Sequence, residues 1–230
     1  MKFENGPQLL LNLNLDNETR FQNFFEFNDE AELIEELKGR SSLVYLWGSP
    51  GSGRSHLLQA VCHDSYNKQE SSMFLSLAKA ESYSPEILSG IEGISAVCLD
   101  DIQAISKNTT WEEAIFRLYN EAQQTNCRLI ISSDRPPQDL SITLADLQSR
   151  LCGFPVFKLH SPDEKQRFEI LKFRAKLRGV KLDNDVLNYI SNNIRRSLHE
   201  IIDLLNVLDE ASKIEKRKIT IPLIKKVMGW

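Results

Sequence analysis

From residue 42 to residue 159, two kinds of hydrophobic pattern alternate along the chain. Short apolar runs are separated by longer segments in which apolar residues recur every three or four positions. The runs are typical of buried strands and the longer segments of amphipathic helices, since a helix repeats about every 3.6 residues. Strands alternating with helices predict βαβ units, hence a mostly parallel sheet covered on both faces. The expected strands are residues 42–47, 73–77, 96–99, 129–132 and 156–159, and the expected helices are 54–63 and 111–125.

The pattern changes after Ser161, where the strands stop. A long helix is expected over 163–178, opened by Ser161-Pro162 and ended by Gly179, because proline favours the first turn and glycine the residue after the last. Further helices are expected around 186–190, over 198–211 and from Thr220. The chain therefore predicts a tail (1–18), an α/β domain (19–160) and a small all-helical lid domain (161–230).

A glycine-rich segment links the first expected strand to the helix after it. Gly48-Ser-Pro-Gly-Ser-Gly-Arg-Ser55 matches the phosphate-binding pattern G-x-x-x-x-G-K-[ST] except for its lysine. Glycines there let backbone N–H groups face phosphates, and the helix N-terminus favours their negative charge. The Ser55 hydroxyl is a candidate Mg²⁺ ligand. The candidate nucleotide-binding residues are Gly48, Pro50, Gly51, Ser52, Gly53, Arg54, Ser55 and His56.

Arg54 replaces the lysine of this pattern. A guanidinium keeps the positive charge and binds phosphates in a bidentate way, but it is bulkier and planar. We expect it to hold a nucleotide but to align the γ-phosphate and an attacking water poorly.

The expected strand at 96–99 runs into two carboxylates, Asp100 and Asp101. A strand ending in paired acids fits an element in which Asp100 coordinates Mg²⁺ and Asp101 lies near the attacking water. The alternative is that the two acids only cap a loop or a helix.

Bulk properties narrow the class of protein. The chain has 230 residues, 41% hydrophobic and 26% charged, with a net charge of −4, which disfavours a general nucleic-acid coat. The sequence has no signal-peptide pattern and no run of 18 apolar residues, so we expect a cytoplasmic protein without a membrane span. Its four cysteines form no C-x-x-C pair and are expected to be buried free thiols.

Three further segments carry a resemblance to a known family: Arg128 to Pro137, Leu147 to Leu151 and Arg195 to Glu200. With the glycine-rich loop and the paired acids, they resemble the AAA+ core of the DnaA family over about residues 19–228. The resemblance is closer to the Hda group of DnaA-related regulators than to DnaA itself. The segments that carry this resemblance are Gly53 to Leu58, Asp134 to Pro137, Lys218 to Pro222 and Gln8 to Leu13. In addition, the chain stops where a DnaA continues into a helix-turn-helix domain.

The resemblance assigns roles to single residues. It implies that Asp134 lies in the sensor 1 region and that Arg150, at a helix end, is an arginine finger acting across a subunit interface. Alternatively, Arg150 pairs with a local carboxylate. Phe21 and Phe24 match a segment that packs near the base, although core aromatics need no such role.

One position departs from the family pattern. His199 stands where the family has the sensor 2 arginine, and a neutral histidine does not replace a permanent cation. Arg195 and Arg196, four and three residues earlier, are candidate substitutes on nearly the same helix face.

The tail carries a match to a motif that binds the sliding clamp of DNA polymerase III. By the resemblance, Gln8, Leu9, Leu11 and Leu13 contact the clamp, although Leu10 and Asn12 depart from the family pattern. The alternative is a short edge strand, because Leu9, Leu11, Leu13 and Leu15 occupy every second position.

The resemblance implies a regulator that binds ADP or ATP with Mg²⁺ and hydrolyses it weakly or not at all by itself. It would dock on the DNA-loaded clamp and stimulate hydrolysis of DnaA-bound ATP, limiting re-initiation of replication. The alternatives are a helicase-loader-type ATPase on single-stranded DNA and an adaptor that targets DnaA without stimulating it. Contact with DNA is expected to be weak or indirect, and self-association stays open.

Overall fold

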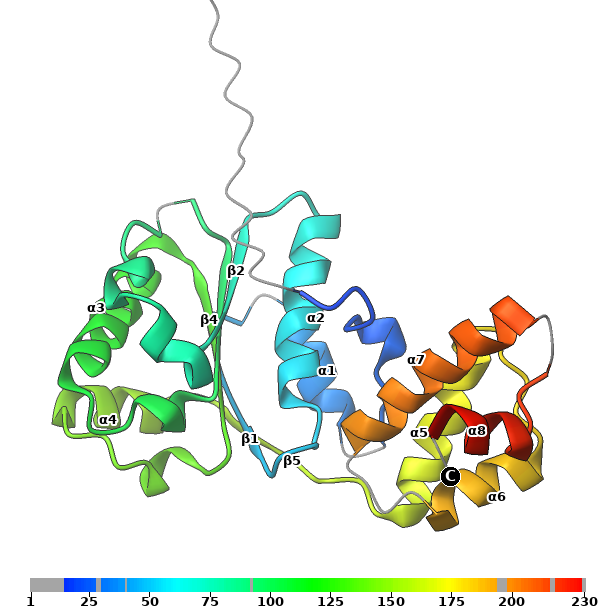
Figure 1. Cartoon of the computed structure of the whole chain (residues 1–230). Coiled ribbons are helices and arrows are strands. Elements are labelled where there is room, and N and C mark those ends of the chain that lie inside the picture. Colours follow the sequence, from blue (N-terminus) through cyan, green and yellow to red (C-terminus); the bar gives the residue numbers. More distant parts are fainter. Residues whose placement is uncertain are drawn as a thin grey trace, which may run out of the picture. The chain divides into compact units, whose positions relative to one another are not determined.

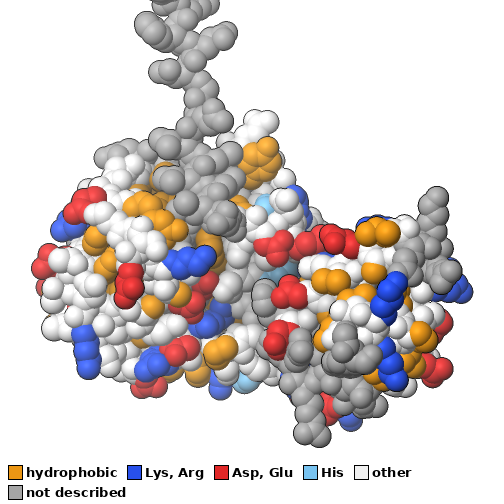
Figure 2. Space-filling model, in the orientation of Figure 1, with side chains coloured by type: hydrophobic (Ala, Val, Ile, Leu, Met, Phe, Trp, Pro, Cys, Tyr) orange, Lys and Arg blue, Asp and Glu red, His pale blue; other side chains and the backbone are white. Residues whose placement is uncertain are grey.

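The computed structural model describes residues 15–27, 30–39, 41–91, 93–193, 198–215 and 218–228. The chain divides into two compact units, Met1–His160 and Ser161–Trp230. Figure 2 shows basic and acidic side chains interspersed over the visible face of each unit. None of the described helices is both long and apolar enough to span a lipid bilayer.

The first unit is built on a five-stranded parallel sheet in the order β2-β3-β4-β1-β5 (Figure 1). Its strands are β1 (Leu43–Gly48), β2 (Ser72–Ser76), β3 (Ala96–Asp100), β4 (Arg128–Ser133) and β5 (Val156–Leu159). In this order β4 lies between β1 and β3, and Trp47 is in register with Ser133. Because the strands are parallel, the residues that follow β1, β3 and β4 meet at one edge of the sheet.

Helices cover both faces of this sheet. Figure 1 shows α1 (Ala31–Lys38) and α2 (Arg54–Asn67) on one face, and α3 (Thr109–Thr125) and α4 (Ala145–Cys152) on the other. Each face has its own hydrophobic core: Val44 and Leu46 pack with α2, whereas Tyr45 packs with α3. Successive residues of one strand thus enter opposite cores, as the period of two in a strand requires. Short 3-10 helices complete the unit: η1 (Phe21–Asn23), η2 (Leu77–Ser82), η3 (Pro85–Leu88), η4 (Ile102–Ile105) and η5 (Pro137–Asp139).

The second unit contains only helices among its described residues. They are α5 (Glu164–Leu177), α6 (Asn184–Asn193), α7 (Leu198–Glu215) and α8 (Ile221–Met228). Asp163 precedes α5 and forms a capping box with Gln166. The Asp163 side chain accepts the backbone N–H of Gln166, and the Gln166 side chain accepts the backbone N–H of Asp163. The core of this unit includes Leu171, Leu187 and Leu208.

The structure confirms the predicted fold class, a parallel α/β domain followed by a helical one. Two local features differ from the expectations. The helix α1 was not predicted. Three cysteines are buried free thiols, but Cys152 is exposed. The reason is its place in α4, whose buried side chains are Leu147 and Leu151.

Candidate nucleotide-binding site

The glycine-rich loop connects β1 to α2, and its conformation depends on glycine at two positions. A Cβ atom on Gly48 would lie 2.4 Å from the Leu159 carbonyl oxygen. Gly53 has φ +98°, a left-handed conformation, and a Cβ atom there would lie 2.8 Å from Cε2 of Phe24. The loop therefore packs against β5 on one side and against the N-terminal segment on the other.

Two polar atoms of this loop have no hydrogen-bond partner among the described residues, although both are buried. They are the Ser52 hydroxyl and Nη1 of Arg54. Leaving a buried polar atom unpaired costs about 1–3 kcal/mol, and more for a charged group. These atoms lie at the N-terminus of α2, where backbone N–H groups and the helix dipole favour an anion. This arrangement fits the binding of phosphate groups.

The other half of the Arg54 guanidinium is paired with Asp101, the residue directly after β3. Nη2 of Arg54 lies 3.1 Å from Oδ1 of Asp101, and the arginine is only 8% exposed. Nε2 of Gln103, in η4, donates to the same Oδ1 at 2.9 Å. Asp101 itself has φ +60°, a left-handed conformation that non-glycine residues rarely adopt. Its carboxylate is thus held by two donors.

Asp100, the first of the two acids, is buried at the end of β3 and bound to the neighbouring strand. The Ser132 hydroxyl, on β4, donates to Oδ1 of Asp100 and accepts the backbone N–H of Asp101 at 3.1 Å. Burial raises the pKa of the Asp100 carboxyl, as does nearby Asp101, and hydrogen bonds from Ser132 and Ser55 lower it in part.

Asp100 and Ser55 offer two hard oxygen donors, which suit Mg²⁺, an ion that keeps waters and takes substrate phosphate oxygens as its other ligands. Within the described ranges, no three His, Cys, Asp or Glu side chains cluster as a protein-only metal cage. The donor set therefore fits a magnesium ion bound together with a nucleotide.

Asp134, the candidate sensor 1 residue, follows β4 at the same edge of the sheet. Arg135 donates to its carboxylate through Nε at 2.7 Å and Nη2 at 2.9 Å, which lowers the pKa of the Asp134 carboxyl. The backbone N–H of Asp134 donates to Oε1 of Gln103 at 3.2 Å. Gln103 thus joins Asp101 to the turn after β4.

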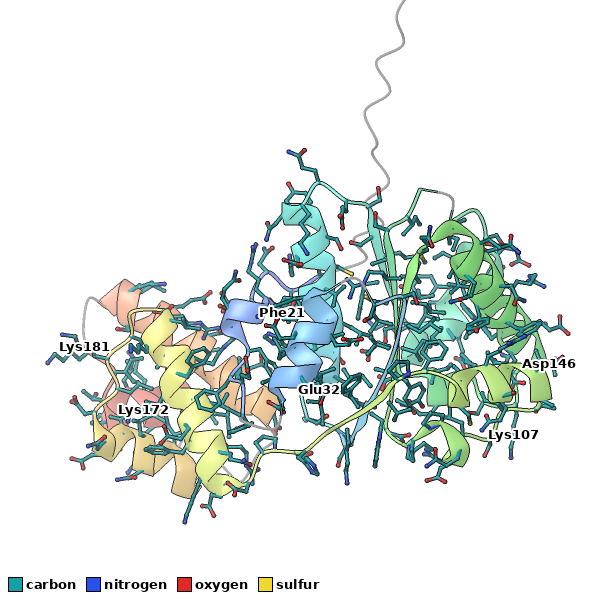
Figure 3. The ribbon with its side chains drawn as sticks, turned by 180° about the vertical axis from the view of Figure 1, so that it is seen from behind. Phe21, Glu32, Lys107, Asp146, Lys172 and Lys181 are labelled. Carbon is teal, nitrogen blue, oxygen red and sulfur yellow. The ribbon has the colours of Figure 1, made fainter. Side chains whose placement is uncertain are left out.

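The N-terminal segment contacts the start of α2. The rings of Phe24 and His56 lie 5.5 Å apart, and Nε2 of His56 is 2.9 Å from the Arg20 carbonyl oxygen. Phe21 and Phe24 pack against the core on the α2 face, and Figure 3 marks Phe21 in η1. Both phenylalanines therefore contact the core, and Phe24 also lies beside the loop at Gly53.

Arg150 lies elsewhere, in the last turn of α4, on the sheet face opposite α2 (Figure 1). It is exposed, and its guanidinium carbon is 5.5 Å from the centre of the Tyr119 ring. Among the residues that the structure describes, no carboxylate lies within ion-pair distance of Arg150. The alternative role, pairing with a local acid, has no support in this part of the chain.

Several sequence candidates lie outside the described residues: Gln8, Leu9, Leu11, Leu13, Arg195 and Arg196. The side chain of His199 lies outside them as well.

Together, the loop between β1 and α2, the paired acids after β3 and the strand order define a P-loop domain of the AAA+ class with a helical second unit. The chain belongs to the family of the bacterial DnaA ATPase domain, whose family model matches residues 21–154. A model of the Hda lid domain matches residues 163–228.

Solved structures share the fold at low sequence identity. Domain III of the Thermotoga maritima replication initiation protein DnaA is 21% identical with a TM-score of 0.76, covering 94% of this chain and 98% of that one. AMPPCP-bound DnaA from Aquifex aeolicus is 23% identical with a TM-score of 0.69, covering 84% of this chain and 66% of that one. The RuvB Holliday junction branch migration motor from Thermotoga maritima is 19% identical with a TM-score of 0.58, covering 86% and 64%.

Proposed function

We propose that this chain binds an adenine nucleotide with Mg²⁺ at the loop from Gly48 to Ser55. The observation that carries the proposal is the pair of buried, unpartnered polar atoms of Ser52 and Arg54 at the N-terminus of α2. A phosphate group would supply the missing acceptor for Nη1 of Arg54. Ser55 and Asp100 would hold Mg²⁺, which neutralises phosphate charge when it is bound.

The bound nucleotide is proposed to be preferentially the diphosphate, with weak or no hydrolysis by the chain itself. The carboxylate of Asp101, the candidate for orienting an attacking water, already accepts from Arg54 and Gln103. An oxygen that already accepts two hydrogen bonds has less capacity left to accept one from an attacking water. Calorimetric titration tests this point, and ATP binding more than tenfold tighter than ADP would contradict it.

We further propose that the chain stimulates hydrolysis of ATP held by DnaA, with Arg150 as the finger. Membership of the DnaA family and the match to the Hda lid domain support DnaA as the partner. The exposure of Arg150, on the sheet face opposite α2, supports action on a second molecule. A finger contributes about 10³- to 10⁵-fold in rate, on the order of 4–7 kcal/mol.

The test is ATP hydrolysis by DnaA, measured with clamp-loaded DNA and this chain. Arg150→Ala should lose most of the stimulation, and Arg150→Lys should restore little, because lysine lacks the planar fork. Arg117→Ala, at an exposed arginine of α3, is the matched control and should stimulate normally. Full stimulation by Arg150→Ala would instead support the non-stimulating adaptor.

Docking on the clamp is proposed to reside in residues 8–13. Gln8→Ala combined with Leu11→Ala should abolish retention by immobilised clamp and leave the melting temperature unchanged. Burying one leucine contributes roughly 1.5–3 kcal/mol. The double variant should therefore lose a weak contact, one that two binding sites on the clamp ring strengthen in the unaltered chain. A melting temperature several degrees lower would favour the alternative of a structural strand.

The helicase-loader alternative has less support. It requires a lysine in the phosphate loop, where this chain has Arg54, and a basic groove for the DNA backbone. Basic and acidic side chains are interspersed on the faces seen in Figure 2.

A further inference from the structure

The helix α4, which carries Arg150, is attached to α3 near its first residue by a buried carboxylate. Glu112, on α3, is fully buried. Its Oε2 accepts the backbone N–H groups of Thr143 at 2.9 Å and Leu144 at 2.8 Å, the two residues before α4. Its Oε1 accepts the N–H of Lys107, in the loop before α3, at 2.8 Å. Figure 3 shows Lys107 and Asp146, in the first turn of α4, at the same end of the α/β unit.

A second contact between the two helices lies at the other end of α4. Tyr119 follows Glu112 by seven residues, about two helical turns, so both side chains lie on the same side of α3. The Arg150 guanidinium carbon is 5.5 Å from the centre of the Tyr119 ring, within the range of a cation–π interaction. The Tyr119 ring in turn packs on Phe154, with ring centres 6.0 Å apart.

These two contacts determine the position of α4 and the orientation of the Arg150 side chain, neither of which the sequence of α4 determines by itself. A helix of eight residues is far too short to be stable alone, so its position must come from tertiary contacts. An exposed arginine samples many rotamers, and ordering it on contact with a partner costs entropy. The Tyr119 ring restricts the guanidinium before any partner arrives, which reduces that cost.

We propose that Glu112 and Tyr119 are positioning residues for Arg150. Glu112 sets the position of α4, and Tyr119 holds the guanidinium in the orientation presented to a nucleotide on a second molecule. This inference rests on the proposed finger role of Arg150 and adds the two residues through which that role is prepared.

The test uses the full chain in the DnaA hydrolysis assay with clamp-loaded DNA, titrating each variant to obtain a maximal rate and a half-saturating concentration. Tyr119→Leu removes the π face and should lower the maximal stimulated rate about two- to fivefold, the range of an exposed cation–π contact. Tyr119→Phe keeps the ring and should restore wild-type stimulation. Phe116→Leu, at another partly buried aromatic residue of α3 packed against the same core, is the matched control and should keep the maximal rate.

Two further readouts separate positioning from stability. In the Arg150→Ala background, Tyr119→Leu should cause no additional loss, because Tyr119 acts through the arginine. Glu112→Gln should speed amide exchange at Lys107, Thr143 and Leu144, because a neutral amide oxygen is a weaker acceptor than a carboxylate and the amide nitrogen accepts no hydrogen bond. It should also lower the maximal rate while nucleotide binding persists.

The outcomes distinguish this inference from the function on which it rests. If Arg150→Ala abolishes stimulation while Tyr119→Leu keeps the wild-type rate, the positioning role is wrong and the finger stands. A loss in Tyr119→Leu that appears only as a higher half-saturating concentration would also overturn it, since that indicates an interface contact. If Arg150→Ala itself stimulates fully, the proposed function fails.

Discussion

An alanine at Gly53 would destabilise the loop in two ways, through its backbone conformation and through a clash with Phe24, and the same change at Gly51 separates the two effects. Both Gly51 and Gly53 have positive φ, +83° and +98°. An alanine at either position therefore incurs the left-handed backbone penalty, roughly 1–2 kcal/mol. A Cβ atom on Gly51 meets no described atom within 4 Å, whereas one on Gly53 lies 2.8 Å from the Phe24 ring and must displace it. Overpacking of this kind costs about 1–3 kcal/mol more.

We therefore expect Gly51→Ala to lower the free energy of unfolding by about 1–2 kcal/mol and Gly53→Ala by about 2–5 kcal/mol. Urea denaturation followed by tryptophan fluorescence measures both, since Trp47 and Trp111 lie in the α/β unit. Nucleotide titration of the same variants adds a second readout. Gly53→Ala should bind ADP more weakly than Gly51→Ala, because the displaced ring and the loop backbone move together.

A double-mutant cycle with Phe24→Ala decides whether the ring is responsible. Once the ring is absent, Gly53→Ala should cost no more than Gly51→Ala, which requires a coupling energy of about 1–3 kcal/mol between positions 24 and 53. Additivity within about 0.5 kcal/mol would refute the reasoning. It would mean that Phe24 does not lie against the phosphate loop in solution.

Two further predictions concern the acids and the metal. Asp101→Asn should bind ADP about three- to tenfold tighter, on the order of 1 kcal/mol, as measured by calorimetry. The reason is that it removes a negative charge 3.1 Å from the Arg54 guanidinium proposed to face the phosphates. Unchanged or weaker binding would contradict this role of the ion pair. Ser55→Ala should retain binding in EDTA but lose most of the gain that Mg²⁺ gives the wild type, and an undiminished Mg²⁺ effect would exclude Ser55 as a ligand.

The sequence predicted those parts of the fold whose signal is local. All five strands coincide with apolar runs, and the phosphate loop is recognisable because its glycines stand between a strand and a helix. The helix α1 escaped prediction because neither a proline nor a capping side chain marks its start, and Leu33, Ile34 and Leu37 are its only buried side chains. Such a helix depends on tertiary packing rather than on its own propensity.

The contacts within the site could not be predicted because they depend on strand order. Ser132 reaches Asp100 only because β4 lies beside β3, and a local pattern does not reveal which parallel strands are neighbours. Arg54 and Asp101 are likewise 47 residues apart in the chain. Gln103 carried no signal at all, since one amide after two acids has no distinctive spacing.

The geometry of the site offers a physical reason for an arginine in place of lysine at position 54. A lysine concentrates its charge and its three donors on one nitrogen, so a carboxylate and a phosphate compete for the same atom. The guanidinium of Arg54 separates these tasks: Nη2 binds Asp101, while buried Nη1 is left without a partner among the described residues. One side chain can then hold a phosphate and keep the second acid engaged at once. Under the proposed function, a site of this kind would retain its nucleotide rather than hydrolyse it, and exposed Arg150 would be the residue that acts on a second molecule.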